Sequence, residues 1–239
     1  MLLADLSWEQ AQEYLAKDDR LIFPIGATEQ HGRHLGLGCD FQIAERCAVI
    51  AGERTNVAVA PTLTYGMSLH HMKFAGTLSL RPVTLIAVLE DVLRTAYAHG
   101  FRRILIVNGH GGNTAAIDSA LAVVANELAG LRVKLFEWWK EPEILKLADD
   151  YAGPQRGTHS SPIETAFMMV ARPNAVVMER APKRDMPVER AHEFLSASLF
   201  AQLYPDGVMG LDPSAGTVEL GNQLLEKSVE FCTREISEW

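Results

Sequence analysis

The chain has 239 residues with a formal net charge of −8, and 48% of its residues are hydrophobic. This length can bury a large core, and no low-complexity linker divides it, so a single domain over residues 1–239 is predicted. The acidic balance argues against a general affinity for nucleic acid or for anionic membranes, because both are bound by basic patches.

Cysteine usage and hydropathy favour a cytoplasmic enzyme. The three cysteines lack CxxC spacing, which predicts neither a disulfide framework nor a structural zinc knuckle. Asp5 and Glu9 interrupt the N-terminal sequence before an apolar stretch of signal-peptide length accumulates. No run approaches the roughly 18 apolar residues of a membrane span. We therefore expect a cytoplasmic location.

Short apolar runs alternate with helical patterns along the chain. In order, the predicted elements are a buried strand at 20–25, a helix at 40–52, a strand at 57–60, a helix over 85–96, a strand at 104–107, a helix over 117–128, a strand at 132–137 and a C-terminal helix from 214. This order predicts an α/β fold, a single compact domain whose mainly parallel sheet is flanked by helices on both faces. Residues 138–160 break the rhythm and predict a partly irregular excursion that serves as a lid or a subunit contact.

The first motif with chemical content is G-A-T-E-Q-H-G, which directly follows the strand at 20–25. Glu29 and His31 are two positions apart, so in an extended segment their side chains point to the same side. Together with Asp40 they offer suitable ligands for a divalent transition metal. The spacing alone fits a second interpretation equally well, with Asp40 as a helix N-cap and the other two as solvated loop residues.

The second motif, N-G-H-G-G-N, lies between the strand at 104–107 and the next helix. Its glycines permit a tight turn, and ligands bind at the carboxyl ends of strands in open α/β sheets. His110 is expected near a helix N-terminus, where the dipole disfavours the imidazolium and keeps the ring in its neutral, metal-binding form. A phosphate cradle or an exposed histidine would be the alternatives, but the lack of a Lys-Ser/Thr pair argues against a P-loop.

The third motif is T-H-S-S-P-I-E-T at 158–165. Ser161 as N-cap, Pro162 at the first helical position and Glu164 three residues after the cap form a capping box, which explains Glu164 without any chemistry. His159 has no comparable structural role and is a candidate functional residue.

A fourth segment, at 65–80, places two histidines beside Ser68 and Thr77 in a predicted loop. Its composition fits contact with substrate, support of other site residues, or an interface.

These segments together resemble the creatininase (creatinine amidohydrolase) family. The matching blocks are P-I-G-A-T-E-Q-H-G-x-H-L with Asp40, Y-G-M-S-x-x-H-x-x-F-A-G-T, I-L-I-V-N-G-H-G-G-N, H-S-S-P-I-E-T and P-D-G-V-M-G-L-D-P-S-A-G-T. They follow the family's order across nearly the whole chain, which is far more specific than any one block.

The resemblance implies a creatininase-like fold and two divalent metals per subunit, zinc foremost, with manganese or iron as alternatives. It also implies a homo-oligomer, a hexamer in the family. The implied metal ligands are Glu29, His31, Asp40 and His110, with Asp40 bridging both metals. His159 matches a histidine that transfers protons.

The chain departs from the family pattern after His110. Creatininases continue with a large residue and a glutamate ligand, whereas Gly111 and Gly112 stand here. We therefore expect Glu164 to supply the missing ligand and to assist His159 in catalysis. The G-G form resembles the deformylase and peptide-processing branches, which argues against creatinine as the substrate.

The predicted reaction is hydrolysis of a C–N amide bond in a small, cyclic amide or formamide by a metal-activated water. Expected substrate contacts are Ser68, His71, Thr77, Gly111 and Gly112. One alternative is deformylation of a formylaminopyrimidine nucleotide, which phosphate contacts from Arg33, Lys73 or Arg81 would support. Another is a catalytically idle metal-binding subunit or a partner in peptide maturation.

Overall fold

The computed structural model describes residues 1–153, 157–183 and 194–239. Its main sheet has four parallel strands in the order β2 (Ala58–Val59), β1 (Arg20–Ile25), β3 (Arg103–Asn108) and β4 (Arg132–Glu137). All four predicted strands are therefore present, with the second one shorter than expected.

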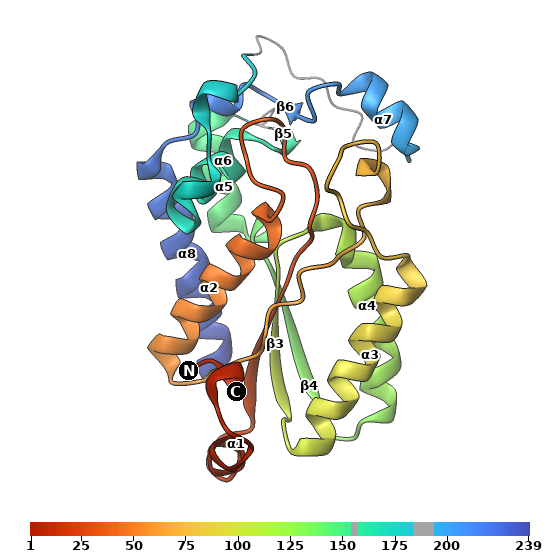
Figure 1. The fold of residues 1–239 in the computed structure, drawn as a ribbon. Helices are drawn as coiled ribbons and strands as arrows, with labels where there is room; N and C mark the ends of the chain where they lie inside the picture. Colours follow the sequence, from red (N-terminus) through yellow and green to blue (C-terminus); the bar gives the residue numbers. More distant parts are fainter. Residues whose placement is uncertain (154–156, 184–193) are drawn as a thin grey trace.

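Helices cover both faces of this sheet (Figure 1). One layer contains α2 (Cys39–Thr55), α5 (Pro142–Ala152), α6 (Pro162–Ala171) and α8 (Val218–Ser237), and the other contains α3 (Pro82–His99) and α4 (Thr114–Glu127). The shorter helices α1 (Trp8–Leu15) and α7 (Ala197–Leu203) lie near opposite ends of the molecule (Figure 1). The α/β fold class with a helix-flanked, mainly parallel sheet is confirmed.

The two cores follow from the period-two alternation of the strands. Leu105 and Val107 of β3 pack into the core formed with α2, α6 and α8, whereas Ile104 and Ile106 pack into the core formed with α3 and α4. Because both faces of the strand are covered, its sequence is a continuous apolar run instead of an alternating one.

The segment at 138–160, predicted to be a partly irregular excursion, also contains a full helix and a short strand. Residues 142–152 form α5, which starts with a proline at its first turn and buries Ile144 and Ala148. Gly157–His159 form β5, which pairs antiparallel with β6 (Met209–Gly210). Residues 154–156 lie outside the described part of the chain. The proposed lid or subunit-contact role of this segment stays a prediction.

The strand order positions the functional loops. β1 and β3 are hydrogen-bonded neighbours although β2 separates them in sequence, so the strand order reverses between them. In open α/β sheets a crevice forms outside the carboxyl ends of the strands at such a point. The loops that follow β1 and β3 meet there, and Gly109 lies so close to α2 that a Cβ would sit 2.1 Å from the Asp40 carbonyl oxygen.

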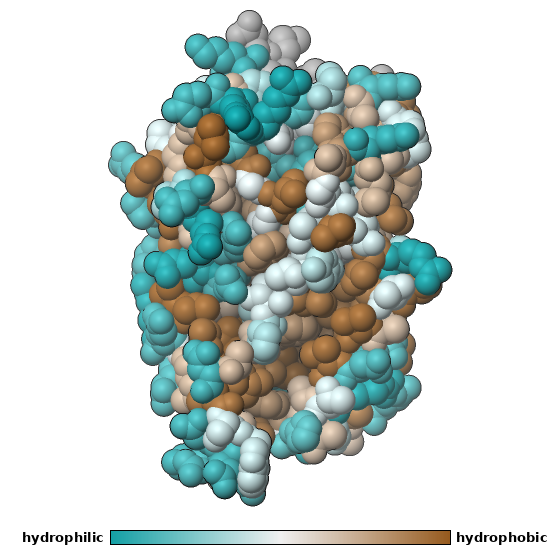
Figure 2. Space-filling view, viewed as in Figure 1, coloured by the Kyte–Doolittle hydropathy of each residue, from teal (hydrophilic) through white to brown (hydrophobic). Residues whose placement is uncertain are grey.

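No helix among the described residues is long and apolar enough to cross a membrane. The viewed surface is polar over much of its area, but brown, apolar side chains gather over its lower middle, between α2 and α3 (Figure 2). Exposed apolar residues of the chain include Tyr65, Leu78 and Val83.

Candidate metal centre

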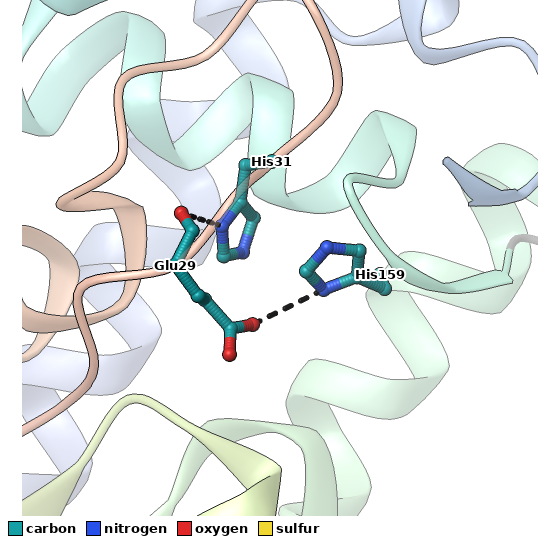
Figure 3. A group of neighbouring side chains, drawn as sticks. All are labelled: Glu29, His31 and His159. Carbon is teal, nitrogen blue, oxygen red and sulfur yellow. Dashed lines mark hydrogen bonds and ion pairs between the residues drawn. The ribbon is translucent and has the colours of Figure 1, made fainter. Parts of the chain in front are cut away.

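Glu29 and His31 lie in the loop that follows β1, and both are fully buried. The Glu29 main-chain oxygen lies 3.4 Å from His31 Nδ1, and the Glu29 carboxylate points toward His159 (Figure 3). A proton on Nδ1 is held by that carbonyl, which leaves His31 Nε2 free to act as a ligand.

Asp40 lies in the first turn of α2, one residue after the helix begins at Cys39. Gly38, not Asp40, occupies the N-cap position, so the capping interpretation of Asp40 is wrong. Its carboxylate instead contacts two imidazoles, with Oδ1 3.0 Å from His31 Nε2 and Oδ2 3.1 Å from His110 Nδ1. One carboxylate therefore links the loop after β1 to the loop after β3.

His110 lies just beyond the end of β3. Its Nε2 is 3.0 Å from the Met67 carbonyl oxygen and 3.4 Å from Glu29 Oε2. Because a carbonyl oxygen only accepts, the Met67 contact favours a proton on Nε2, which makes Nδ1, beside Asp40, the nitrogen that could bind a metal.

His159 ends β5 and reaches the same cluster from another part of the chain. Its Nδ1 lies 3.4 Å from Glu29 Oε1 (Figure 3), and its ring centroid is 4.3 Å from that of His31. The following residue, Ser160, is a non-glycine residue with φ 55°, a conformation that is costly and recurs at functional sites.

Glu164 uses its two carboxylate oxygens differently. Oε2 accepts a hydrogen bond from Ser161 N at 3.3 Å and closes the capping box of α6, as the sequence predicted. Oε1 faces the cluster and lies 3.8 Å from His31 Nε2. The two interpretations of Glu164 are therefore compatible in space.

Three sets of side chains in this cluster could hold a metal ion, because their ligand atoms lie within 4.8 Å of one another: Glu29, His31 and His159; Glu29, Asp40 and His110; His31, Cys39 and Asp40. Among the described residues, both Glu29 carboxylate oxygens and Asp40 Oδ2 are buried without a hydrogen bond of good geometry. Buried carboxylate oxygens are costly unless they are paired or bind a cation. The donor set fits a divalent metal.

The local electrostatics correct one expectation. Burial alone would lower the pKa of His110, but the Glu29 and Asp40 carboxylates outweigh it and raise that pKa to about 9. The expectation that a helix dipole keeps this ring neutral is therefore wrong for the metal-free site. The pKa of His31 is likewise raised well above its ordinary value, because contacts with Cys39 and Asp40 outweigh the opposing effect of burial.

Metal uptake is consequently expected to release protons. Coordination requires neutral imidazoles, so binding near pH 7 should displace the protons of His31 and His110, about two per chain. The raised pKa values mean that proton competition weakens as the pH rises, so the apparent affinity should increase up to about pH 9. Titration calorimetry in buffers of different ionisation enthalpy measures this release. A pH-independent affinity without proton release would contradict the charge assignment, and His99→Gln, at the exposed end of α3, is the matched control.

The glycine in place of the family's glutamate has a steric explanation. A Cβ at Gly112 would lie 2.3 Å from His110 Nε2 and 2.5 Å from the Met67 carbonyl oxygen. No side chain fits at this position while His110 keeps its orientation. Any further ligand must therefore come from another element, and Glu164 is in place to provide it.

A cavity of about 610 Å³ opens onto the cluster. Of the expected substrate contacts, His71, Gly111 and Gly112 line it, whereas Ser68 and Thr77 do not. Thr77 instead accepts a hydrogen bond from the Gln30 main-chain N–H at 3.1 Å.

No lysine or arginine lines this cavity among the described residues. Arg33, Lys73 and Arg81, the residues considered for phosphate binding, are exposed and lie outside its lining.

Sequence reasoning did not single out two residues of the cluster. Cys39 had been considered only as a member of a zinc knuckle or a disulfide, and it is a buried free thiol beside His31 and Asp40. Gln30 lies inside the first motif and contacts two histidines. Its place between two candidate ligands was the available signal.

Comparison with known proteins identifies the fold and the family. The family model of creatininase, described as creatinine amidohydrolase, matches residues 4–236. A mycofactocin precursor peptide peptidase of Mycobacterium tuberculosis is 30% identical over 231 residues, which cover 92% of this chain and 85% of that protein. A creatinine amidohydrolase of Pseudomonas putida is 28% identical over 196 residues, 75% of each chain.

The solved structures agree. A creatininase with manganese is 26% identical with a TM-score of 0.84, covering 99% of this chain and 97% of the other. A creatininase mutant of zinc–zinc type is 25% identical with a TM-score of 0.83 and the same coverage. The chain therefore belongs to the creatininase family and is an amidohydrolase of that family.

Proposed function

We propose that this amidohydrolase cleaves a C–N bond of a small, uncharged amide, cyclic or formylated, at a site for two divalent metals. The observation that carries the proposal is the buried cluster at the floor of the cavity, in which Asp40 contacts one imidazole with each carboxylate oxygen. Because each oxygen of the Asp40 carboxylate lies beside a different imidazole, this carboxylate would be suited to serve two cations.

The residues that would hold the metals are Glu29, His31, Asp40, His110 and Glu164. Zinc is the foremost candidate, with manganese or iron as alternatives, because mixed carboxylate and imidazole sites accept all three. When bound, such ions lower the pKa of a water and polarise a carbonyl group.

Proton movement is assigned to the chain itself. His159 Nδ1 faces Glu29 at the floor of the cavity and is placed to take a proton from the attacking water and to pass it to the leaving nitrogen. Burial lowers the pKa of His159 well below its ordinary value, and the neighbouring His31 lowers it further, so the ring starts neutral and can accept a proton. Main-chain N–H groups of Gly111 and Gly112 are the proposed donors to the developing oxyanion.

The cavity lining supports an uncharged substrate. Its apolar members include Met67, Trp138, Trp139, Ile163, Phe200 and Met209. A nucleotide would need cationic partners for its phosphate, and the described lining offers none, so deformylation of a nucleotide is the weaker alternative.

Cleavage of a peptide C–N bond is a second candidate. It is supported by the mycofactocin precursor peptide peptidases, which match a larger share of this chain than the creatinine amidohydrolase does. The retained His159 argues against a catalytically idle partner. Assembly into a homo-oligomer is also proposed, and the exposed apolar side chains support it (Figure 2).

The proposal is tested by loading the protein with zinc, manganese or iron and measuring turnover of lactams, cyclic ureas, formamides and short peptides. In His159→Gln, turnover is expected to fall by about 10²- to 10⁴-fold with unchanged metal content, because a proton-transfer group is lost and the proposed ligands remain. His99→Gln should behave like the wild type. Metal lost together with activity would make His159 a ligand, and absence of turnover with every amide would contradict the proposed reaction.

A further inference from the structure

The Gln30 side chain has an amide nitrogen within 3.0 Å of both members of a stacked histidine pair. It is 3% exposed, and it lies between Glu29 and His31 without lining the cavity. The rings of His71 and His159 stack beside it with centroids 4.4 Å apart and planes inclined by 22°.

The orientation of the Gln30 amide is fixed by two main-chain groups. Oε1 accepts from Gly32 N–H at 3.0 Å, and Nε2 donates to the Gly207 carbonyl oxygen at 3.0 Å. In the reverse orientation the amide NH2 would face the Gly32 N–H, donor against donor, and the amide oxygen would face the Gly207 carbonyl oxygen, acceptor against acceptor. A Cβ at Gly207 would lie 1.9 Å from Gln30 Oε1, so glycine is needed there for the amide to fit.

This orientation fixes the proton of His71. Gln30 Nε2 has one further hydrogen and lies near two imidazole nitrogens, His159 Nε2 at 2.8 Å and His71 Nδ1 at 3.0 Å. His159 Nε2 is occupied by its own proton, which the Gln30 main-chain oxygen accepts, so the second amide hydrogen is assigned to His71 Nδ1, the unprotonated nitrogen of that ring. The His71 proton then lies on Nε2, 3.4 Å from Glu29 Oε1.

The main chain of Gln30 fixes His159 in the same tautomer, with the proton on Nε2. In this ring, however, the unprotonated nitrogen and not the protonated one faces Glu29. The Gln30 carbonyl oxygen lies 2.8 Å from His159 Nε2 and can only accept, so Nε2 carries the proton. The Gln30 amide nitrogen also lies 2.8 Å from this nitrogen, but a protonated Nε2 cannot accept a hydrogen bond from it. His159 Nδ1 is left with a lone pair that faces Glu29.

We propose that Gln30 is a positioning residue that assigns opposite tasks to the two stacked histidines. His71 becomes a donor that holds Glu29, and His159 becomes an acceptor toward the cavity floor. The Thr77 hydroxyl, which accepts from Gln30 N–H, anchors the main chain that makes this assignment. The catalytic meaning of the His159 lone pair rests on the proposed function, whereas the tautomers themselves do not.

The test is ¹⁵N NMR of the imidazole nitrogens in zinc-loaded protein, with signals assigned through His71→Gln and His159→Gln. The wild type should show the proton on Nε2 of both rings. In Gln30→Glu the acceptor of Gly32 is kept, but an oxygen replaces the donor opposite His71. The His71 proton should then move to Nδ1, while His159, held by a main-chain oxygen, should keep its proton on Nε2.

Activity gives the second readout. With an amide that the wild type hydrolyses, kcat of Gln30→Glu should fall by about 10- to 100-fold, as is typical for residues that orient functional groups, with KM little changed. Gln30→Met removes the donor and adds no acceptor, so His71 should become a mixture of tautomers. If the glutamate variant does not fold, this loss of a single His71 tautomer tests the inference in its place. Gln223→Glu, on the exposed face of α8, is the control for the added charge.

A wild-type proton on Nδ1 of either ring, or an unchanged His71 in Gln30→Glu, would overturn the inference. Expected tautomers in a protein that hydrolyses no amide would support the inference and count against the proposed reaction alone.

Discussion

Asp40→Asn is expected to abolish metal binding and, with it, hydrolysis. Asp40 belongs to two of the three possible metal-holding sets, as Glu29 and His31 also do, and its two oxygens contact His31 and His110 separately. Asparagine keeps the shape but removes the charge and replaces one oxygen by an amino group that cannot coordinate. The affinity loss should exceed the roughly 10- to 100-fold typical of residues that only orient a ligand.

Two measurements test this prediction. Elemental analysis gives the metal content per chain after dialysis, and an activity assay gives the turnover of the reloaded protein. Asp91→Asn on the exposed face of α3 makes the same chemical change away from the cluster and should retain metal and activity. Circular dichroism should show the same secondary structure in both variants, because asparagine fills the same volume. Full metal content in Asp40→Asn would contradict the proposed centre.

The sheet could be predicted from local patterns, whereas the ligand set of the cluster was predicted from the ordered motifs that resemble the creatininase family. The buried strands are continuous apolar runs, and parallel strands bring the residues that follow them to one edge of the sheet. That rule places the segments after β1 and β3 at one edge, and the resemblance to the creatininase family then joined Glu29 with His110 as ligands of one site. The capping box at Ser161 and Glu164 was readable from a local pattern, since it spans only one helical turn.

The remaining features depend on contacts that no local pattern contains. The role of Gln30 requires Gly207, which is 177 residues away, and a count of donors and acceptors around two rings. The charge of His110 depends on how close two carboxylates come, and this overrides the helix-dipole argument. The helix within the segment at 138–160 is a different case: the proline at 142 and the helical spacing of Ile144 and Ala148 were readable, but the neighbouring tryptophans and glycines obscured them.

Glu164→Gln is expected to lose about one metal equivalent per chain while the metal-free protein keeps its stability. Glutamine also closes a capping box, so its amide oxygen should stay on Ser161 N–H in place of Oε2. The amino group then replaces Oε1 opposite His31 Nε2 and cannot bind a cation. The free energy of unfolding of the metal-free protein should change by less than about 1 kcal/mol, because the cap is retained.

Ser161→Ala is the matched variant, because it removes the cap and leaves the Glu164 carboxylate in place. Its metal content should equal that of the wild type, while its free energy of unfolding falls by about 1 kcal/mol, the usual cost of a lost N-cap. Elemental analysis and denaturant unfolding of both variants separate the two roles. If Glu164→Gln kept every metal and lost only stability, Glu164 would be a helix cap alone. The second metal would then need a different ligand, for which Cys39 and His159 are the described candidates outside the proposed ligand set.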